Sequence, residues 1–267
     1  MSKAVAITGG ARGIGLATAR ALKAKGATVV IGDIDEAAVA EAAAEPGVTG
    51  LVVDVTSRES FTAFLDRAEE SAGPLDVVIN NAGIMPIGPV TDESDADARR
   101  CLDINVHGVM LGTKLALGRM LPRGRGHVIN IASLAGVTFM PGLALYNASK
   151  AAVVAFTEAT RLEVQDRGVH VSAVLPTFTN TELVSGMRNP KGQKNCEPED
   201  IAAAVVALIG RPRPQVVVPA KLARQVKLGS LLPERAKRAM ARRYGLDRIF
   251  LDFDPDARKP YDARIRA

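Results

Sequence analysis

Seven short runs of Val- and Ile-rich sequence recur along the chain, and they constrain its fold more than any other feature. They cover residues 3–8, 27–32, 48–54, 75–80, 126–132, 168–176 and 215–220. The runs are almost continuously apolar, which is typical of strands buried on both faces of a parallel sheet. Helix-like stretches lie between them, at residues 16–25, 58–71, 95–120 and 146–166. Repeated strand–helix–strand units predict an α/β fold with a doubly wound, parallel seven-stranded sheet.

The composition is that of an ordinary soluble globular protein. Of the 267 residues, 24% are charged and 47% are hydrophobic, and no apolar run approaches the roughly 20 residues of a membrane span. The two cysteines, Cys101 and Cys196, lack metal-ligand spacing, so we expect neither a disulfide nor a metal site. Met1 leads within two residues into the first strand, so we expect no signal peptide and a cytoplasmic protein.

The net charge of +5 is concentrated in the C-terminal tail. Residues 220–267 hold 13 Lys/Arg and 6 Asp/Glu, whereas the rest of the chain has a net charge of −2. We therefore expect a domain at residues 1–219 and a basic, helical extension at residues 220–267.

Three roles are open for this extension. It is a solvated basic helix packed on its own domain, a helix on an anionic membrane surface, or a contact with a partner or second subunit. Pro233 suits the first position of a helix in which Ala236, Met240 and Tyr244 recur at every fourth position. Nucleic-acid binding is not expected, because no recognised nucleic-acid-reading motif accompanies the charge.

A glycine-rich turn follows the first predicted strand. Residues 8–15 read TGGARGIG, and a helix-like stretch follows directly. Glycines permit a tight turn and a close backbone approach, and a helix N-terminus offers free N–H groups to a pyrophosphate. Such a turn can be purely structural, but its position predicts a dinucleotide site. The candidate contacts are Gly9, Arg12, Gly13, Ile14 and Gly15.

The end of the second predicted strand bears on the choice of cofactor. Asp33 lies there, where a carboxylate accepts hydrogen bonds from both ribose hydroxyls of an adenosine and repels a 2′-phosphate. It therefore favours NAD over NADP, whereas Arg12 could meet such a phosphate and argues the other way. Asp35 is predicted to be a helix N-cap.

The ends of the third and fourth strands extend the same site. Asp54 and Val55 are expected beside the adenine, and Asn81, with Ala82 and Gly83, near the cofactor. Either group could instead only tie its own turn together.

Tyr146 and Lys150 are four residues apart in an alanine-rich helical stretch, so they lie on one helix face. A buried tyrosine beside a lysine at a helix edge is one interpretation. In the other, the cation lowers the pKa of the phenol and makes it usable as an acid or base.

Together these motifs resemble the classical short-chain dehydrogenase/reductase family. The glycine loop, NNAG at residues 80–83, Asn105 in DINVHG, Ser133 in INIASLAG and YNASK at residues 146–150 occur in the family's order. The resemblance covers about residues 3–185. It implies a Rossmann fold and an NAD(P)-dependent oxidoreductase that interconverts an alcohol and a ketone.

The resemblance also implies residue roles. Tyr146 is the general acid/base, Lys150 holds the nicotinamide ribose and favours the phenolate, and Ser133 donates a hydrogen bond to the substrate oxygen. Asn105 holds a water that joins Lys150 to solvent, or it is only a polar residue that kinks its helix. Near the sixth strand, Pro176 fits the family's pattern.

Further along this loop, Thr181 stands where the nicotinamide carboxamide contact falls. Thr177 replaces the family's usual glycine, which puts the geometry of the loop in question.

We predict an NAD-dependent alcohol dehydrogenase or ketone reductase that forms a homodimer or homotetramer. Apolar segments at residues 85–89 and 137–145, with a lid at residues 185–195, favour a lipophilic substrate. A non-catalytic dinucleotide sensor or scaffold on the same fold is the main alternative, although it would not need the intact Ser133–Tyr146–Lys150 set. A membrane-peripheral reductase of lipids differs only through the tail. Three residues are interpreted as structural: His107, His127 and His170.

Overall fold

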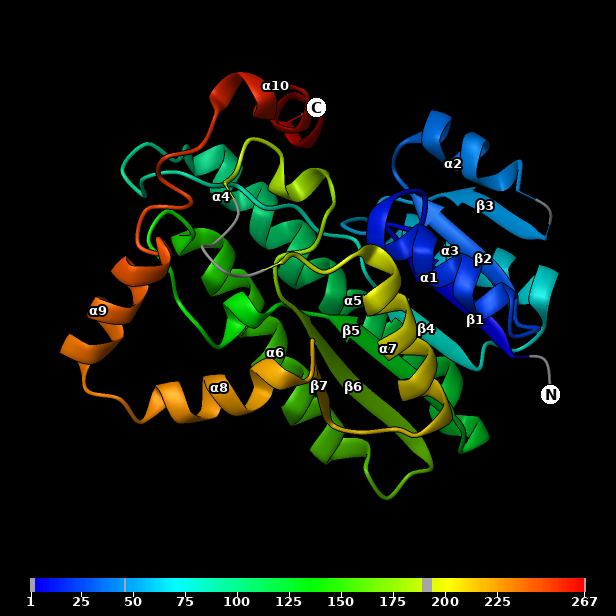
Figure 1. The fold of residues 1–267 in the computed structure, drawn as a ribbon. Coiled ribbons are helices and arrows are strands. Elements are labelled where there is room, and N and C mark those ends of the chain that lie inside the picture. The colour runs from blue at the N-terminus through cyan, green and yellow to red at the C-terminus, as the bar shows by residue number, and fades with distance from the viewer. Residues whose placement is uncertain (1–2, 46, 189–193, 267) are drawn as a thin grey trace.

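The computed structural model describes residues 3–45, 47–188 and 194–266. Its centre is a parallel sheet of seven strands in the order β3-β2-β1-β4-β5-β6-β7 (Figure 1). The strands are β1 (Ala4–Thr8), β2 (Thr28–Asp33), β3 (Val48–Val52), β4 (Val77–Asn80), β5 (Gly126–Ile131), β6 (Val169–Pro176) and β7 (Gln215–Val218). The predicted doubly wound sheet is confirmed.

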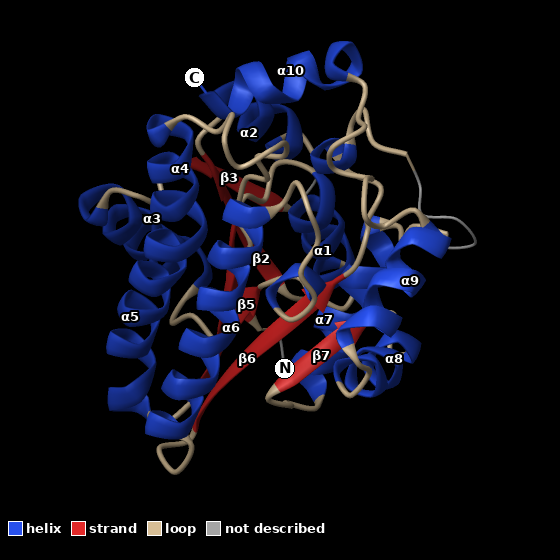
Figure 2. Cartoon of the chain, turned by 90° about the vertical axis from the view of Figure 1, so that its left-hand side faces the viewer, coloured by secondary structure: helices blue, strands red, loops and turns tan. Residues whose placement is uncertain are grey.

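Helices cover both faces of the sheet, and Figure 2 shows the strands between the two helical layers. One layer contains α1 (Gly13–Lys23), α2 (Glu36–Ala43) and α7 (Pro198–Gly210), and the other α3 (Arg58–Ala72), α5 (Val109–Met120) and α6 (Ala144–Val164). Strand residues alternate between the two layers: Val5 and Ile7 pack into the first core, Ala4 and Ala6 into the second. Both faces are therefore dry, as the continuous apolar runs predict.

The helical stretch predicted at residues 95–120 is interrupted. It consists of α4 (Asp95–Leu102), a π-helical turn at Asp103–Gly108, and α5. Asn105 lies within the π-helical turn and is fully buried. Such turns are rare, lie mostly inside α-helices and occur often at functional sites. Three 3₁₀ turns complete the main domain, at Leu121–Arg123, Leu134–Gly136 and Glu182–Val184.

The C-terminal extension is helical, as predicted. It contains α8 (Lys221–Ser230), α9 (Glu234–Tyr244) and α10 (Pro255–Arg266). In Figure 1, α8 and α9 project from the body beyond β7, whereas α10 lies near α4. The sequence predicted Pro233 at the first position of α9, but it is the N-cap of that helix. Its ψ of 148° is extended rather than helical.

The two ends of the extension differ in burial. None of the residues of α9, all of which the structure describes, is buried, so packing on its own domain does not hold for this helix. Ile249, Phe250, Arg258 and Tyr261, by contrast, are all buried. Among the described residues, no helix combines the length and apolar content needed to cross a bilayer.

Candidate active site

The glycine loop joins β1 to α1, and its glycine positions leave little room for a side chain. Gly9 and Gly13 have φ of +60° and +48°, which disfavours any residue with a Cβ. A Cβ on Gly15 would lie 2.1 Å from the carbonyl oxygen of Gly9. The Nδ2 of Asn81 donates to the carbonyl oxygens of Thr8 (3.0 Å) and Gly9 (2.8 Å), which fixes the loop against β4. The loop is thus a rigid cradle whose open side fits a pyrophosphate.

The adenosine end of this cradle carries two carboxylates. Asp33 ends β2, and its Oδ2 accepts the N–H of Ala11 in the glycine loop at 3.4 Å. Asp35 is the N-cap of α2, as predicted, and accepts from the N–H of Ala38. It also holds Arg12, with 2.7 Å between Nη2 and Oδ2. The Ala38 N–H and the Arg12 guanidinium lower the pKa of Asp35, so Arg12 faces a charged partner.

The residues that follow β3 and β4 line the same site as the glycine loop. They are Asp54, Val55, Asn81, Ala82 and Gly83. The Oδ1 of Asp54 accepts from the backbone N–H (2.8 Å) and hydroxyl (2.7 Å) of Thr56. One carboxylate oxygen of Asp54 therefore stabilises the turn that follows β3. This is the structural role that the sequence left open beside a cofactor contact. For Asp54 the two roles are compatible, because its other oxygen takes no part in these bonds.

Three polar residues meet at the far end of the cradle. Ser133 follows β5 as the N-cap of a 3₁₀ turn, while Tyr146 and Lys150 lie on consecutive turns of α6. Both α6 residues are buried, with 7% and 4% of their surface exposed. The Nζ of Lys150 donates to the carbonyl oxygen of Ile131 at 3.0 Å and lies 5.7 Å from the centre of the Tyr146 ring.

The electrostatics of this group differ from the prediction. Burial raises the pKa of Tyr146, and the hydrogen bond with Ser133 opposes that rise. Burial also lowers the pKa of Lys150 to about 8. In the chain alone the pKa of the phenol is therefore raised rather than lowered, because desolvation by burial outweighs the hydrogen bond that favours the phenolate. A positive charge brought next to the phenol would act in the predicted direction.

Asn105 ties the π-helical turn to the loop after β4. Its Oδ1 accepts the N–H of Ile84 at 2.8 Å, and its Nδ2 donates to the carbonyl oxygen of the same residue at 2.8 Å and to the Ser149 hydroxyl at 3.1 Å. A Cβ on Gly83 would lie within 3.4 Å of both Asn105 Oδ1 and Lys150 Nζ. Asn105 is thus next to Lys150, and the water relay stays a prediction.

The loop after β6 reaches the glycine cradle. Pro176 ends the strand, and the N–H of Thr177 donates to the Val218 carbonyl oxygen at 3.0 Å. Thr181 lies against the glycine loop, 3.2 Å from the position of a Cβ on Gly13. With Thr177 in place of the family's usual glycine, the loop thus places Thr181 beside the glycine loop. Within the lid predicted at residues 185–195, residues 189–193 lie outside the described residues.

The sequence analysis missed the contribution of α10. Arg258 has none of its surface exposed, and its guanidinium donates to the carbonyl oxygens of Met85, Leu183 (2.9 Å) and Ser185 (3.3 Å). Tyr261 accepts the N–H of Met85 at 2.8 Å and lies under the Arg258 guanidinium, 4.7 Å from ring centre to Cζ. This helix therefore joins both loops that border Tyr146.

Apolar side chains surround the proposed substrate space. One buried cluster contains Met85, Leu143, Tyr146 and, from the extension, Ile249 and Phe250. Phe178 stacks on Phe250 with 5.7 Å between ring centres. The predicted apolar segments thus line the site, and the tail supplies a wall that was not predicted.

A single hollow connects these features. It extends from the glycine loop past Tyr146 to α8 and α9, and its volume is about 2950 Å³. Small-molecule pockets usually have roughly 300–1,000 Å³, so this hollow holds more than one subsite. Within the described residues, no group of His, Cys, Asp and Glu could hold a metal ion.

Comparisons with known proteins agree with this geometry. The sequence model of a family described as short chain dehydrogenase matches residues 3–192. A cis-4-hydroxycyclohexanecarboxylate dehydrogenase from Sinomonas cyclohexanicum is 38% identical over 217 residues, 76% of this chain and 87% of the relative. A 2-(S)-hydroxypropyl-CoM dehydrogenase 3 from Xanthobacter autotrophicus is 37% identical over 228 residues, 78% and 89% of the two chains. A crystal structure of a short-chain dehydrogenase/reductase from Burkholderia phymatum in complex with NAD has a TM-score of 0.77 at 26% identity, covering 86% of this chain and 93% of that one.

Proposed function

Because the chain belongs to the short chain dehydrogenase family, whose members bind a nicotinamide dinucleotide, we propose that it is an NAD-dependent enzyme that interconverts a lipophilic secondary alcohol and its ketone. The observation that carries this proposal is the meeting of Ser133, Tyr146 and Lys150 between the glycine cradle and an apolar cluster. A sensor or scaffold needs the cradle but not a buried acid and cation at its end.

Ketone reduction needs a proton at the carbonyl oxygen. Tyr146 donates that proton, and the hydroxyl of Ser133 donates a hydrogen bond to the same oxygen as negative charge develops on it. Once bound, the nicotinamide supplies or accepts the hydride, which no side chain here can do. The apolar walls exclude water, so the proton comes from Tyr146 rather than from solvent.

In alcohol oxidation the proton moves in the opposite direction, from the substrate hydroxyl to Tyr146. The phenolate of Tyr146 must form first, and burial makes that form costly. Lys150 supports it as a cation, and its pKa of about 8 means that the charged form dominates below that pH. We therefore expect the rate of oxidation to rise with pH up to about 8, where Lys150 begins to lose its charge, and to gain little above that pH.

The preference for NAD rests on Asp33 and Arg12. The carboxylate of Asp33 at the end of β2 favours ribose hydroxyls and disfavours a 2′-phosphate. Arg12 could counter this preference, but its Nη2 pairs with Asp35, so a 2′-phosphate would have to compete with that carboxylate. The residue after Asp33 is Ile34, which offers no second cation.

The substrate class is drawn from the walls of the site. Met85, Leu143 and Phe250 form a buried apolar surface beside Tyr146, which suits a hydrocarbon-rich alcohol rather than a sugar. The two relatives from Sinomonas and Xanthobacter are both named as dehydrogenases of a hydroxy compound. These names support the reaction type, and the apolar wall supports the lipophilic substrate.

The test is NADH consumption with ketones graded from short aliphatic to steroid-sized. Tyr146→Phe removes one hydroxyl and nothing else, so it should bind NADH normally and lose about 10²- to 10⁴-fold in kcat/KM. Rising kcat/KM with ketone size supports the lipophilic class. Tight NADH binding without turnover of any ketone would refute the proposed reaction and favour the sensor. Light scattering on the same samples tests the proposed homodimer or homotetramer.

A further inference from the structure

Helices α8 and α9 follow one another across a short turn (Figure 1), and their charge sets them apart from the rest of the molecule. Residues 221–244, which we name the basic hairpin, contain eight Lys/Arg and one Glu, a net charge of +7. The whole chain carries +5, so all other residues together carry −2. The entire positive excess of the protein therefore lies on two helices.

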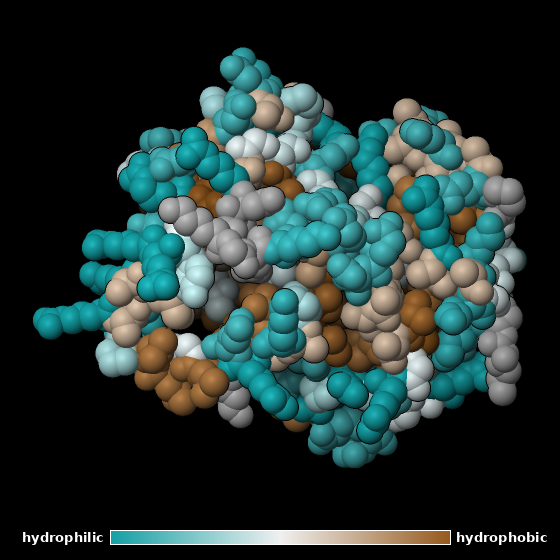
Figure 3. All heavy atoms as spheres, in the orientation of Figure 1, coloured by the Kyte–Doolittle hydropathy of each residue, from teal (hydrophilic) through white to brown (hydrophobic). Residues whose placement is uncertain are grey.

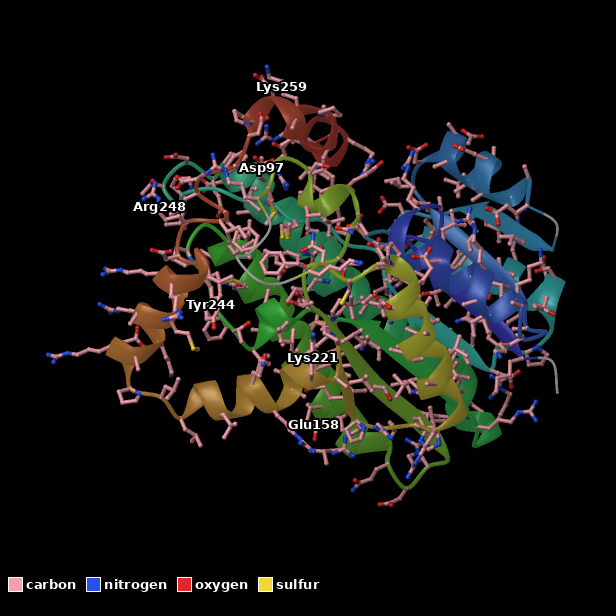
Figure 4. All side chains as sticks on the ribbon, in the orientation of Figure 1. Asp97, Glu158, Lys221, Tyr244, Arg248 and Lys259 are labelled. Atoms are coloured by element: carbon pink, nitrogen blue, oxygen red, sulfur yellow. The ribbon has the colours of Figure 1, made fainter. Side chains whose placement is uncertain are left out.

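Little of this charge is neutralised by the part of the chain that the structure describes. Among the described residues, the basic hairpin forms one ion pair, between Arg238 and Glu234 of the same helix. Figure 4 shows long nitrogen-tipped side chains extending from α9 away from the body. A cluster of four to eight cations on an amphipathic helix is the pattern that anionic lipid surfaces attract.

An apolar tip accompanies the cations. Leu228, Leu231 and Leu232 are 66%, 80% and 38% exposed, and Figure 3 shows brown surface gathered at the turn between α8 and α9. A single exposed leucine needs no explanation. Three within five residues, next to cations on both helices, form a wedge that matches the boundary between headgroups and acyl chains.

The basic hairpin also borders the entrance to the substrate site. Val226, Leu232, Met240 and Tyr244 line the hollow that contains Tyr146. An apolar molecule that leaves a bilayer beneath the hairpin would thus meet apolar side chains on its way to the phenol.

We propose that the basic hairpin docks the protein on an anionic membrane surface, with the leucine tip in the headgroup region and the site open toward the lipid. The delivery of a lipophilic substrate from that surface rests on the proposed function, whereas the docking itself does not.

A second copy of the chain fits this surface less well. A symmetric contact between two such hairpins would bring two patches of +7 together, and like charges at an interface oppose association. An anionic lipid surface instead neutralises the cations and takes up the leucines at the same time.

The experiment is co-sedimentation of the full-length protein with vesicles, without cofactor or substrate. One vesicle is phosphatidylcholine alone and the other contains roughly 30% phosphatidylserine, each at about 0.1 M and about 0.5 M salt. We expect binding to the anionic vesicles at low salt, and loss of most of it at high salt or without phosphatidylserine. Deleting the tail is avoided, since it would also remove Arg258 and Tyr261 from the site.

Matched variants locate the contact. Replacing Arg224, Arg235 and Arg243 with Gln should reduce the partition coefficient at least tenfold, and Leu231→Ser severalfold. These residues are exposed and touch no part of the proposed catalytic group. The control replaces three exposed cations of the main domain, Lys25, Arg67 and Arg125, with Gln, and Leu162→Ser on α6 controls for the leucine. Both controls should stay within twofold of the unaltered protein.

Each outcome decides the proposal. No vesicle binding at low salt overturns it, and so does an equal loss in the control, because the attraction would then follow net charge alone. If the hairpin variants change the molar mass in light scattering and the unaltered protein does not bind to vesicles, the basic hairpin is a contact between copies of the chain. The proposal is then wrong.

Activity separates docking from delivery. With a long-chain ketone dissolved in the vesicles, the hairpin variants should lose at least tenfold in kcat/KM, while a short soluble ketone is reduced at the unaltered rate. Vesicle binding without turnover of either ketone supports the docking and refutes the proposed function.

Discussion

Arg258 offers the sharpest test of how the extension shapes the site. The change is Arg258→Leu, which keeps an apolar stem of similar reach but removes the guanidinium. Three backbone carbonyl oxygens, those of Met85, Leu183 and Ser185, then lose their donor. Asp262, the ion-pair partner of Arg258, is 28% exposed and is left to water.

The magnitude follows from opposing contributions. Hydrogen bonds to a charged group contribute about 1.5–3 kcal/mol each, so three bonds give about 5–9 kcal/mol. The desolvation of the buried guanidinium offsets several kcal/mol of this, and that same desolvation lowers the pKa of Arg258. The net loss is therefore about 2–4 kcal/mol, a shift of about 30- to 700-fold in the equilibrium between docked and undocked α10.

The effect should be local, because Arg258 contacts loops and not the sheet. Hydrogen exchange in α10 and at residues 182–187 should accelerate by that factor, and the KM for a lipophilic ketone should rise more than kcat falls. The matched control is Arg266→Leu on the same helix, whose side chain is 62% exposed and pairs with Asp97; exposed pairs contribute about 0–1 kcal/mol. The reasoning is refuted if the two variants exchange at the same rate.

Three further predictions test the cofactor site and the core. Asp33→Ser should shift the ratio of kcat/KM for NADP to that for NAD upward by about 10- to 100-fold, since a carboxylate near a phosphate costs several kcal/mol; an unchanged ratio would contradict its proposed role. Gly15→Ala should abolish NADH binding in calorimetry, because its Cβ would meet the Gly9 carbonyl oxygen at 2.1 Å, whereas Gly118→Ala, with nothing within 4 Å, should bind normally. His127 is buried and its pKa is lowered to about 3, so the unfolded chain takes up the proton first as pH falls below about 6.5. The free energy of unfolding should therefore drop by about 2 kcal/mol between pH 6.5 and 5 from this residue, and urea titrations of His127→Asn should lack that part of the slope.

The sheet and most of the site could be predicted because their signals are local. A strand buried on both faces must be apolar throughout, so Val77–Asn80 and its neighbours are visible as runs. The glycine cradle is visible because positive φ at Gly9 and Gly13 requires glycine. Tyr146 and Lys150 share a helix face, so their spacing alone places them together.

Other features depend on contacts across the chain that no local pattern reveals. Arg12 and Asp35 are separated by 23 positions and meet only because β2 places its end beside the glycine loop. The raised pKa of Tyr146 depends on how completely the folded chain excludes water. The pairing of Tyr146 with Lys150 predicted a lowered pKa for the phenol, but burial decides the direction of the shift.

The extension illustrates why net charge alone could not resolve its role. Residues 245–267 contain five Lys/Arg and five Asp/Glu, and each of the five cations makes an ion pair: with Asp252, Asp262, Asp256, Glu182 and Asp97. The basic hairpin has eight cations for one acid. Where cations and acids balance, the chain folds back on itself and buries Arg258 beside the site; where they do not, α9 stays exposed. Charge balance counted segment by segment therefore separates the part of the tail that packs beside the site from the part for which we propose an anionic surface outside the protein.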